Sequence, residues 1–244
     1  MVNKLVLQSV INKYYLGENE SVKWIIKDKT LTIDFMSINK EVIGKITCQN
    51  IDIEDCELAI FDTKKFLSLL NITQGELLVE LEKHKSIPTK LHFQDSKFNL
   101  TYALADPLLI SKVGTVTEME WDATFPLDSE DLLNLVKAKT ALGDIDNMVV
   151  STEIDLNGDK MCLFTFGDEN GHNNKITYQL YGKIEKDNIK LPFNSNQFKN
   201  ILNINKDLKE GKLHLNANGL MKLEFTSGDS RSEYYMVRKE DRAF

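Results

Sequence analysis

Apolar residues recur along the chain with two different periods, and each period predicts one kind of element. Four segments place apolar side chains at every third or fourth position, which is the spacing of one face of an amphipathic helix. Between them lie short segments in which apolar and polar residues alternate, as in half-buried strands. The sequence therefore predicts a mixture of helices and strands. The expected helices are Asn3–Leu16, Thr63–Thr73, Ser129–Leu142 and Ser195–Lys206.

The order of these elements repeats. The segment from Phe61 to Ile72 returns as Phe193 to Ile204 with five of twelve positions identical, and Asp62 and Asn194 are each expected to cap a helix. Each half reads as helix, strands, helix, strands, which indicates a duplicated unit. The expected strands are Val22–Lys27, Thr30–Met36, Val42–Cys48, Leu58–Phe61, Leu77–Glu82, Thr89–Phe93 and Phe98–Leu104 in the first half, and Met148–Asp155, Lys160–Phe166, Lys175–Tyr181, Ile189–Phe193, Lys212–Ala217, Met221–Phe225 and Glu233–Arg238 in the second.

The length of 244 residues fits two modest domains. We predict a first domain over residues 1–105, a linker over 106–125 and a second domain over 126–244. The linker is rich in Thr, Ser and acids, holds Pro107 and begins no clear element. Tight hairpin turns are expected at Asn157-Gly158 and Asn218-Gly219.

Composition excludes several classes of protein. A hydrophobic content of 42% supplies real cores. The sequence shows no apolar run long enough to span a membrane and no signal peptide, so we expect a soluble intracellular chain. Its three cysteines are odd in number and lack CxxC spacing, which is typical of free thiols in a reducing cytosol.

Catalytic chemistry is sparse. The four histidines lie far apart, and the usual phosphate-loop, dinucleotide, nucleophile-elbow and zinc motifs are missing. The segment from Asp155 to Asp159 resembles a calcium loop but lacks the downstream Glu, so a hairpin is favoured. The sequence predicts no metal and no cofactor, and a scaffold or binding protein rather than an enzyme. Two enzymatic alternatives are an acidic cluster at Asp52, Glu54 and Asp55 and a site built from His92 with Asp95.

Charge is distributed unevenly. The net charge is −7, yet the four expected helices carry eight lysines and only two acids. A positive helical face on a negative protein favours a polyanion as partner. All three arginines lie in the last fourteen residues, and lysine suits phosphates better than it reads bases, so we expect contact without sequence preference. The predicted DNA-facing residues are Lys4, Lys13, Lys64, Lys65, Lys137, Lys139, Lys199 and Lys206.

A duplicated unit with two lysine-bearing helices over strands resembles a DNA sliding clamp. The segment from Glu57 to Asp62 leading into Phe66-Leu67-Ser68-Leu69-Leu70 is similar to the clamps of T-even-type phages, as are Ala103-Leu104-Ala105-Asp106-Pro107 and the terminal Phe244. Residue matches cover about a fifth of the chain. The acidic linker residues Glu118, Glu120 and Asp122, and helices without arginine, depart from that pattern.

The resemblance implies an α+β fold of clamp domains, related to that of proliferating cell nuclear antigen, with inner helices packed on outer antiparallel sheets. It implies a head-to-tail homotrimer that encircles double-stranded DNA in the cytoplasm of the infected host cell. A clamp loader would open the ring, the replicative DNA polymerase would dock on it, and sigma-like late-transcription factors are further partners in the phage family. The main alternative is a duplicated virion structural protein without DNA.

By the same resemblance, the strand Phe98–Leu104 is expected to pair with Ile176–Tyr181 of the neighbouring subunit, because unpaired edges need a partner. The predicted interface residues are Phe98, Leu100, Tyr102, Ile176, Tyr178 and Leu180. Partner tails are expected in a groove beside the linker, whose apolar residues stand in an otherwise exposed segment. The predicted groove residues are Leu108, Leu109, Ile110 and Val113, with Tyr235 and Val237 as the opposite wall.

Overall fold

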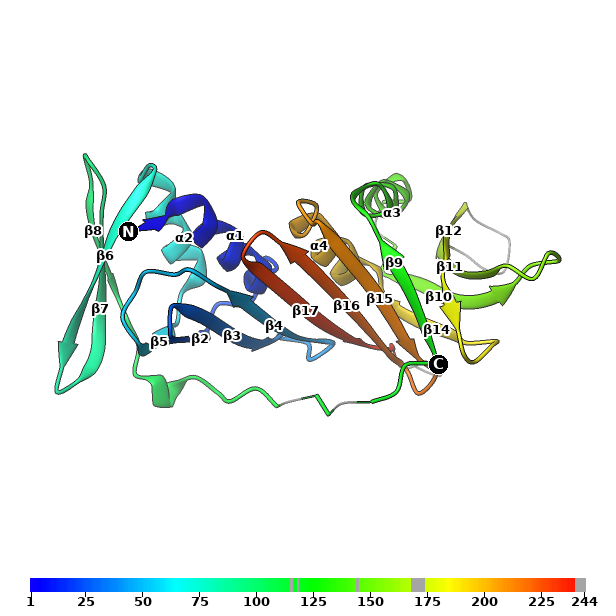
Figure 1. Ribbon diagram of the computed structural model, residues 1–244, viewed down its shortest axis with the longest axis horizontal. Coiled ribbons are helices and arrows are strands. Elements are labelled where there is room, and N and C mark those ends of the chain that lie inside the picture. The colour runs from blue at the N-terminus through cyan, green and yellow to red at the C-terminus, as the bar shows by residue number, and fades with distance from the viewer. Residues whose placement is uncertain (115, 118, 144, 168–173, 240–244) are drawn as a thin grey trace. The chain divides into compact units, whose positions relative to one another are not determined.

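The computed structural model describes residues 1–244 except 115, 118, 144, 168–173 and 240–244 (Figure 1). Glu118 and Phe244, which entered the family comparison above, lie outside the described residues. The chain divides into two compact units. Unit 1 comprises Met1–Ile38, Gly44–Gly114 and Asp229–Ser232, and unit 2 comprises Asn39–Ile43, Thr115–Gly228 and Glu233–Phe244.

Unit 1 contains two helices and two sets of strands. The helices are α1 (Lys4–Tyr15) and α2 (Thr63–Ile72). One four-stranded sheet has the order β1 (Val2–Asn3), β6 (Glu76–His84), β7 (Ile87–Gln94) and β8 (Asn99–Ala103). The second set has the order β5 (Cys56–Ile60), β2 (Val22–Lys27), β3 (Thr30–Met36) and β4 (Val42–Cys48), and the short 3-10 helix η1 (Pro107–Leu109) follows β8 in the chain.

Unit 2 is built on the same plan. Its helices are α3 (Ser129–Ala141) and α4 (Ser195–Ile204). Its four-stranded sheet has the order β12 (Lys175–Tyr181), β11 (Lys160–Gly167), β10 (Asn147–Ile154) and β14 (Lys190–Asn194). The other strands have the order β13 (Lys183–Ile184), β9 (Ala123–Leu127), β15 (Glu210–Asn216), β16 (Leu220–Ser227) and β17 (Ser230–Val237).

The two repeated helices begin as the sequence predicts. The Asp62 side chain accepts the Lys65 N–H at 2.7 Å, and the Asn194 side chain accepts the N–H groups of Asn196 and Gln197. Each cap satisfies donors that a helix leaves unpaired in its first turn. The predicted caps are therefore confirmed, and α3 begins at Asp128 in a reciprocal capping box.

Each repeated helix presses one phenylalanine into its own unit. Phe66 of α2 is fully buried, with its ring 4.7 Å from that of Tyr102 and 5.5 Å from that of Phe93. Phe198 of α4 is also fully buried and stacks on Phe164 at 5.5 Å. These contacts hold each helix against one face of the four-stranded sheet of its own unit.

The structure confirms a hairpin turn that the sequence predicted, and it also contains short strands that the sequence did not predict. Strands β10 and β11 pair antiparallel up to Ile154 and Lys160, which confirms the hairpin at Asn157-Gly158. Strand β9 begins inside the range predicted as linker and ends in the predicted second domain, and its Phe125 is fully buried. Its five residues include Pro126, which weakens any strand pattern. The two-residue strands β1 and β13 are too short to leave a periodic signal.

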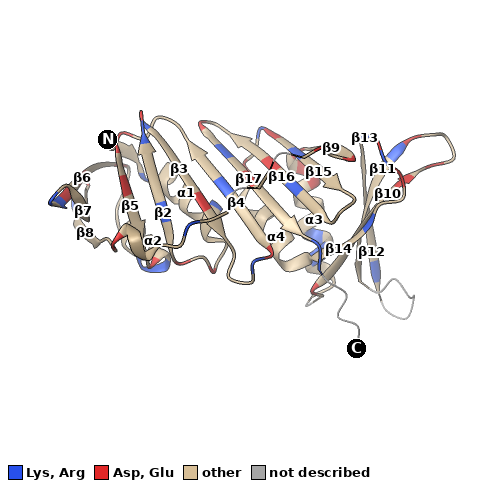
Figure 2. Ribbon diagram, turned by 90° about the horizontal axis from the view of Figure 1, so that it is seen from below, with Lys and Arg blue, Asp and Glu red and all other residues tan. Residues whose placement is uncertain are grey.

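In the described part of the chain, no helix has the length and apolar character needed to cross a membrane. Acidic and basic side chains are interspersed on the strands of both units (Figure 2).

Candidate functional site

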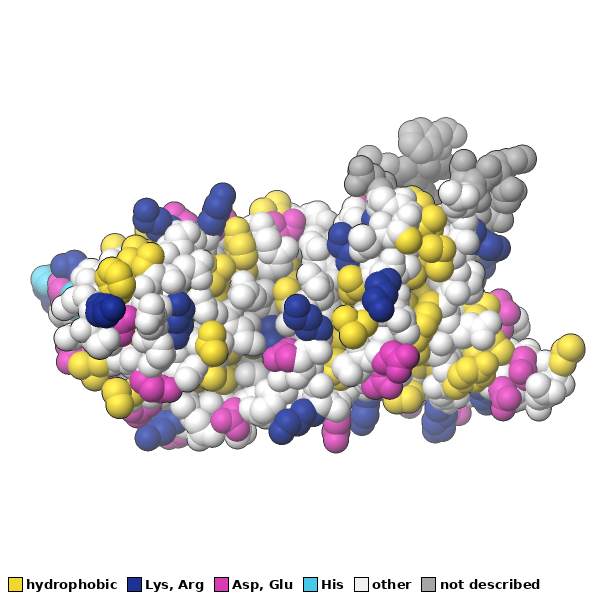
Figure 3. Space-filling model, turned by 90° about the horizontal axis from the view of Figure 1, so that it is seen from above, with side chains coloured by type: hydrophobic (Ala, Val, Ile, Leu, Met, Phe, Trp, Pro, Cys, Tyr) yellow, Lys and Arg dark blue, Asp and Glu magenta, His cyan; other side chains and the backbone are white. Residues whose placement is uncertain are grey.

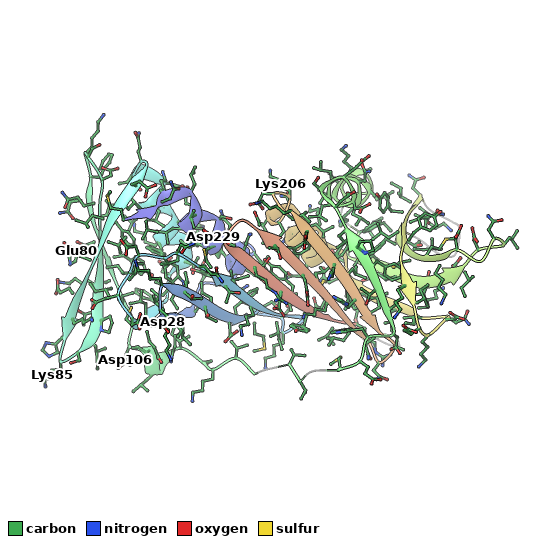
Figure 4. All side chains as sticks on the ribbon, in the orientation of Figure 1. Asp28, Glu80, Lys85, Asp106, Lys206 and Asp229 are labelled. Atoms are coloured by element: carbon green, nitrogen blue, oxygen red, sulfur yellow. The ribbon has the colours of Figure 1, made fainter. Side chains whose placement is uncertain are left out.

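The lysines of the helices differ in exposure. Lys64, Lys65, Lys137 and Lys206 are exposed, and Lys4 and Lys199 are half-buried. Lys206 lies just beyond the end of α4 (Figure 4). On the helix side of the units, basic side chains are scattered among uncharged and acidic ones (Figure 3).

Two predicted DNA-facing lysines are buried, and their assignment was wrong. Lys13 is 1% exposed and Lys139 is 2% exposed. Lys139 follows the buried Leu132 and Leu135 by seven and four residues, so helix geometry turns it inward. Its Nζ donates to the Gly143 carbonyl at 2.5 Å, where a cation stabilises the C-terminal end of α3. Lysine is usually solvated, but the position of Lys139 on the buried face of α3 gives it a role in stabilising the helix.

Lys4 is half-buried and already bound within unit 1. Its Nζ donates to the carbonyl of Asn71 at 3.0 Å and to that of Thr73, where α2 ends. The ammonium thus satisfies carbonyls that the helix leaves without partners. A contact from Lys4 to another molecule would compete with these two bonds.

Strand β8 is an edge of its sheet, and its backbone alternation is fixed by two hydrogen bonds. The Leu104 N–H donates to Thr89 O at 2.9 Å, and the Asp95 N–H donates to Phe98 O at 3.0 Å. In an antiparallel pair, alternate residues direct both backbone groups to the partner strand. Residues 98, 100, 102 and 104 therefore bond toward β7, and Thr101 directs its N–H and C=O away from the sheet.

Strand β12 is an edge of the corresponding sheet of unit 2, where β11 is its neighbour among the described residues. The Gly182 N–H donates to Lys160 O at 3.1 Å, in register with the pairing of Tyr181 and Met161. Residues 176, 178 and 180 consequently bond toward β11. The backbone groups of Thr177 and Gln179 point away from the sheet.

The side chains of the two edges point partly into their own units. Tyr102 and Leu180 are each 4% exposed, so their predicted roles as interface side chains were wrong. Strand alternation turns both side chains toward the helices of their own units. The side chains of the adjacent strand residues, such as Thr101 and Gln179, are exposed to solvent. Phe98 is 40% exposed. Leu100, Ile176 and Tyr178 are half-buried.

The inward tyrosines reach the first turns of two helices. The Tyr102 hydroxyl accepts the Asp62 N–H at 3.1 Å, at the N-cap of α2. The Tyr178 hydroxyl donates to Asp131 Oδ1 at 2.8 Å, in the first turn of α3. Both edges are therefore overlain by a helix N-terminus.

A groove of about 440 Å³ lies in unit 1 between residues 109–113, which begin at the end of η1, and the strands β2 and β3. The chain segment contributes Leu109, Ile110 and Val113, and the strands contribute an apolar floor. That floor consists of Val22, Ile25, Phe35 and Met36. Asp106 (Figure 4) begins η1 by accepting the Leu108 N–H at 2.8 Å, which fixes the start of the segment.

The predicted opposite wall was wrong. Leu108 is 90% exposed and does not line the groove, and Tyr235 and Val237 belong to unit 2. Tyr235 instead lies in a charged cluster, where its hydroxyl bonds Glu233 at 3.3 Å and the Lys222 Nζ lies 5.2 Å from its ring centroid. The floor strands come from a part of the chain that is distant in sequence, and the pattern of the linker alone gave no sign of them.

The enzymatic alternatives find no support in the geometry. Asp95 accepts backbone N–H groups from Gln74, Lys97 and Phe98, and these bonds, led by Lys97, lower the pKa of its carboxyl group. The ring of His92 contacts Thr101 and Glu82 instead.

The acidic cluster is also engaged, because Asp52 pairs with the N-terminal amine and Glu54 pairs with Lys83. Asp55 accepts the Asp28 N–H at 3.0 Å. The Asp155 side chain accepts the N–H groups of Asn157 and Asp159, as in a turn. Among the described residues, no group of three or more His, Cys, Asp or Glu side chains is arranged to hold a metal ion.

Comparison with known proteins agrees with this architecture. The sliding clamp of Vibrio phage KVP40 is 36% identical over 109 residues, which cover 42% of this chain and 47% of that relative. The match thus spans about half of the relative's length. No family model matches the sequence.

Solved structures show the fold. Proliferating cell nuclear antigen from Entamoeba histolytica superposes with a TM-score of 0.76 at 15% identity, covering 98% of this chain and 96% of that one. The same antigen from A. fulgidus, bound to the C-terminal region of FEN-1, gives a TM-score of 0.78 at 14% identity over 99% of this chain and 98% of its own. The predicted resemblance to a phage sliding clamp and the α+β clamp fold are confirmed.

Proposed function

We propose that this chain, a phage-type sliding clamp related in fold to proliferating cell nuclear antigen, encircles duplex DNA as a head-to-tail homotrimer and tethers the replicative DNA polymerase. The proposal is carried by the two open edges, β8 in unit 1 and β12 in unit 2. Exposed edge strands promote association unless they are covered. Two different edges on one chain give a heterologous contact, which produces a closed ring when the rotation closes.

The backbone alternation supports antiparallel pairing of the two edges. Thr101 directs its backbone groups outward from β8, and Thr177 and Gln179 direct theirs outward from β12. These residues can form the hydrogen-bonded pairs of a new ladder. In that register the inward side chains of both strands lie on the same face, so the helices of both subunits lie on one side of the joined sheet.

In this ring the exposed helix lysines would face the DNA. Lysines contact phosphates as point charges and do not discriminate between bases, so binding would be weak, salt-dependent and nonspecific. The enclosed duplex would be retained by topology, and a clamp loader would be needed to open the ring. We assign no catalytic step and no cofactor to the chain.

The ring is tested by mass and by DNA topology. The wild-type chain should sediment as a trimer, and rings loaded by a clamp loader should remain on closed circular DNA and slide off after linearisation. Thr101→Pro removes an outward N–H and should give monomers, while Thr101→Val keeps that N–H and should stay trimeric. A trimeric proline variant would contradict the β8–β12 pairing. A virion structural protein would assemble without being retained on circular DNA.

We further propose that the groove of unit 1 receives the tail of the polymerase and, in competition with it, the tails of late-transcription factors. Its lining combines apolar side chains with charged ones such as Lys23 and Asp34, and binding sites of this kind draw most of their binding energy from one or two anchors. Leu109→Ser should weaken binding of a labelled polymerase-tail peptide at least tenfold. Leu108→Ser is the matched control, because Leu108 is exposed and does not line the groove. Equal peptide affinities for the two variants would move the site elsewhere.

A further inference from the structure

The helix N-termini above the two open edges differ in charge. The first turn of α2 holds Lys64 and Lys65 and no acid. The first turn of α3 holds Glu130 and Asp131, the only acids on the four helices. The carboxylates of Asp62 and Glu20 bind the backbone N–H groups of Lys65 and Lys64, so these lysines stand beside acids. The first turn of α3 instead adds two acids to its acidic cap residue, Asp128.

The two lysines lie on different flanks of α2. Asn71 accepts a hydrogen bond from Gln8 of α1 at 2.6 Å, which marks the flank that faces α1. At about 100° per residue, Lys64 lies about 20° from Asn71 around the helix, and Lys65 lies about 120° away. The Lys64 N–H is moreover bound by Glu20 at 3.0 Å. Lys65 therefore projects from the flank away from α1.

That flank also adjoins strand β8. Asp62 and Phe66, on either side of Lys65 in sequence, both contact Tyr102. On the other edge, the bond from Tyr178 to Asp131 holds the acidic first turn of α3 above β12. Lys65 and Glu130 are both exposed. Bringing the two edges together would bring these two first turns together as well.

We propose that in the assembled ring Lys65 of one copy contacts the acidic first turn of α3 of the next copy, with Glu130 as its principal partner. This inference rests on the proposed ring. It gives Lys65 a role in the subunit joint in place of a role in the DNA-facing surface, and it gives the two acids of the helices a function.

The contact would select the correct pairing of edges. Two β8 edges brought together would place Lys65 against Lys65, and two β12 edges would place acids against acids. Like charges in contact disfavour an alternative complex, which is how charge patterns specify partners. Backbone pairing alone does not distinguish these arrangements, because every open strand edge offers the same donors and acceptors.

Charge reversal tests the contact by sedimentation at low salt. Lys65→Glu and Glu130→Lys should each weaken one joint about fivefold, the upper range for an exposed ion pair, and so reduce association of the three-joint ring by roughly a hundredfold. The double variant should restore association to within about threefold of the wild type. Lys64→Glu carries the same charge change on the flank that faces α1, and the association of this variant should be close to that of the wild type.

The outcomes separate this contact from the ring itself. Trimers that are equally stable in the wild type and in both single variants would overturn the contact and leave the ring standing. A double variant as weak as the single ones would also overturn it. A wild-type chain that stays monomeric at every concentration would overturn the ring and the contact together. Thermal unfolding of each variant, measured in parallel, identifies losses that come from misfolding.

Discussion

Lys137 and Lys139 lie two residues apart on α3, and they separate a DNA-facing role from a structural one. Lys137 is exposed, whereas Lys139 is 2% exposed and bonds the Gly143 carbonyl. Lys137→Gln should remove a phosphate contact without affecting the fold. Lys139→Gln should destabilise the C-terminal end of α3 and leave DNA affinity at a given ring concentration unchanged.

The size of the effect follows from counterion release. Each lysine–phosphate contact contributes about 0.9 to the slope of log affinity against log salt concentration, so three symmetric contacts per ring contribute about 2.7. Between 50 and 200 mM salt, those three contacts account for roughly a fortyfold change in affinity. A ring of the Lys137→Gln variant should therefore show a visibly shallower salt dependence than the wild type.

The assay is a titration of a labelled linear duplex, which can thread the ring through its free ends, at four or five salt concentrations. Sedimentation in parallel ensures that only trimers are compared. Identical slopes for the Lys137→Gln variant and the wild type would remove Lys137 from the DNA-facing surface. A shallower slope for Lys139→Gln would show that exposure is the wrong criterion for choosing these lysines.

Two further predictions concern thiols and pH. Burial raises the pKa of the Cys56 thiol to about 11 and raises those of Cys48 and Cys162 as well, but only Cys56 is partly exposed. A water-soluble thiol reagent at pH 8 should label Cys56 alone, slowly, until denaturant exposes all three, and rapid labelling of Cys162 would contradict its buried position. Burial lowers the pKa of His214 from 6.5, so the folded state resists protonation and the free energy of unfolding should fall as pH drops below about 6.5. Urea midpoints at pH 8 and pH 5 should differ less for His214→Gln than for the wild type, and an equal difference would refute the assignment.

The elements that were predicted well are those encoded locally. Asp62 and Asn194 cap their helices through bonds to residues two or three positions away, and the turn at Gly158 depends on a few neighbouring residues. Such signals survive in any tertiary context. Lys13 and Lys139 were predicted wrongly because residue type alone does not give the direction in which a side chain leaves its helix. Counting positions from Val10 and Leu135 would have placed both lysines on apolar faces.

Contacts between segments that are distant in the sequence could not be predicted from local sequence patterns. The groove floor at Phe35 and Met36 lies more than seventy residues before the segment at Leu109 that covers it. Likewise, the contact of Tyr178 with Asp131 spans 47 residues and follows from the packing of α3 on β12. The family resemblance had placed Tyr102 at the subunit interface, although it is the packing partner of Phe66.

A closed ring would need little affinity from each lysine, and this relaxes the electrostatic demands on the helices. A protein that binds DNA from one side must offset dissociation by many simultaneous phosphate contacts. A ring around duplex DNA separates from it only when the ring opens or reaches an end. The proposed function is therefore compatible with a DNA-facing surface that lacks Lys13 and Lys139, which are buried, and Lys65, which is assigned to the joint. Under this view stability at the β8–β12 joints limits retention, so joint variants should shorten residence on circular DNA more than lysine variants of the DNA-facing surface.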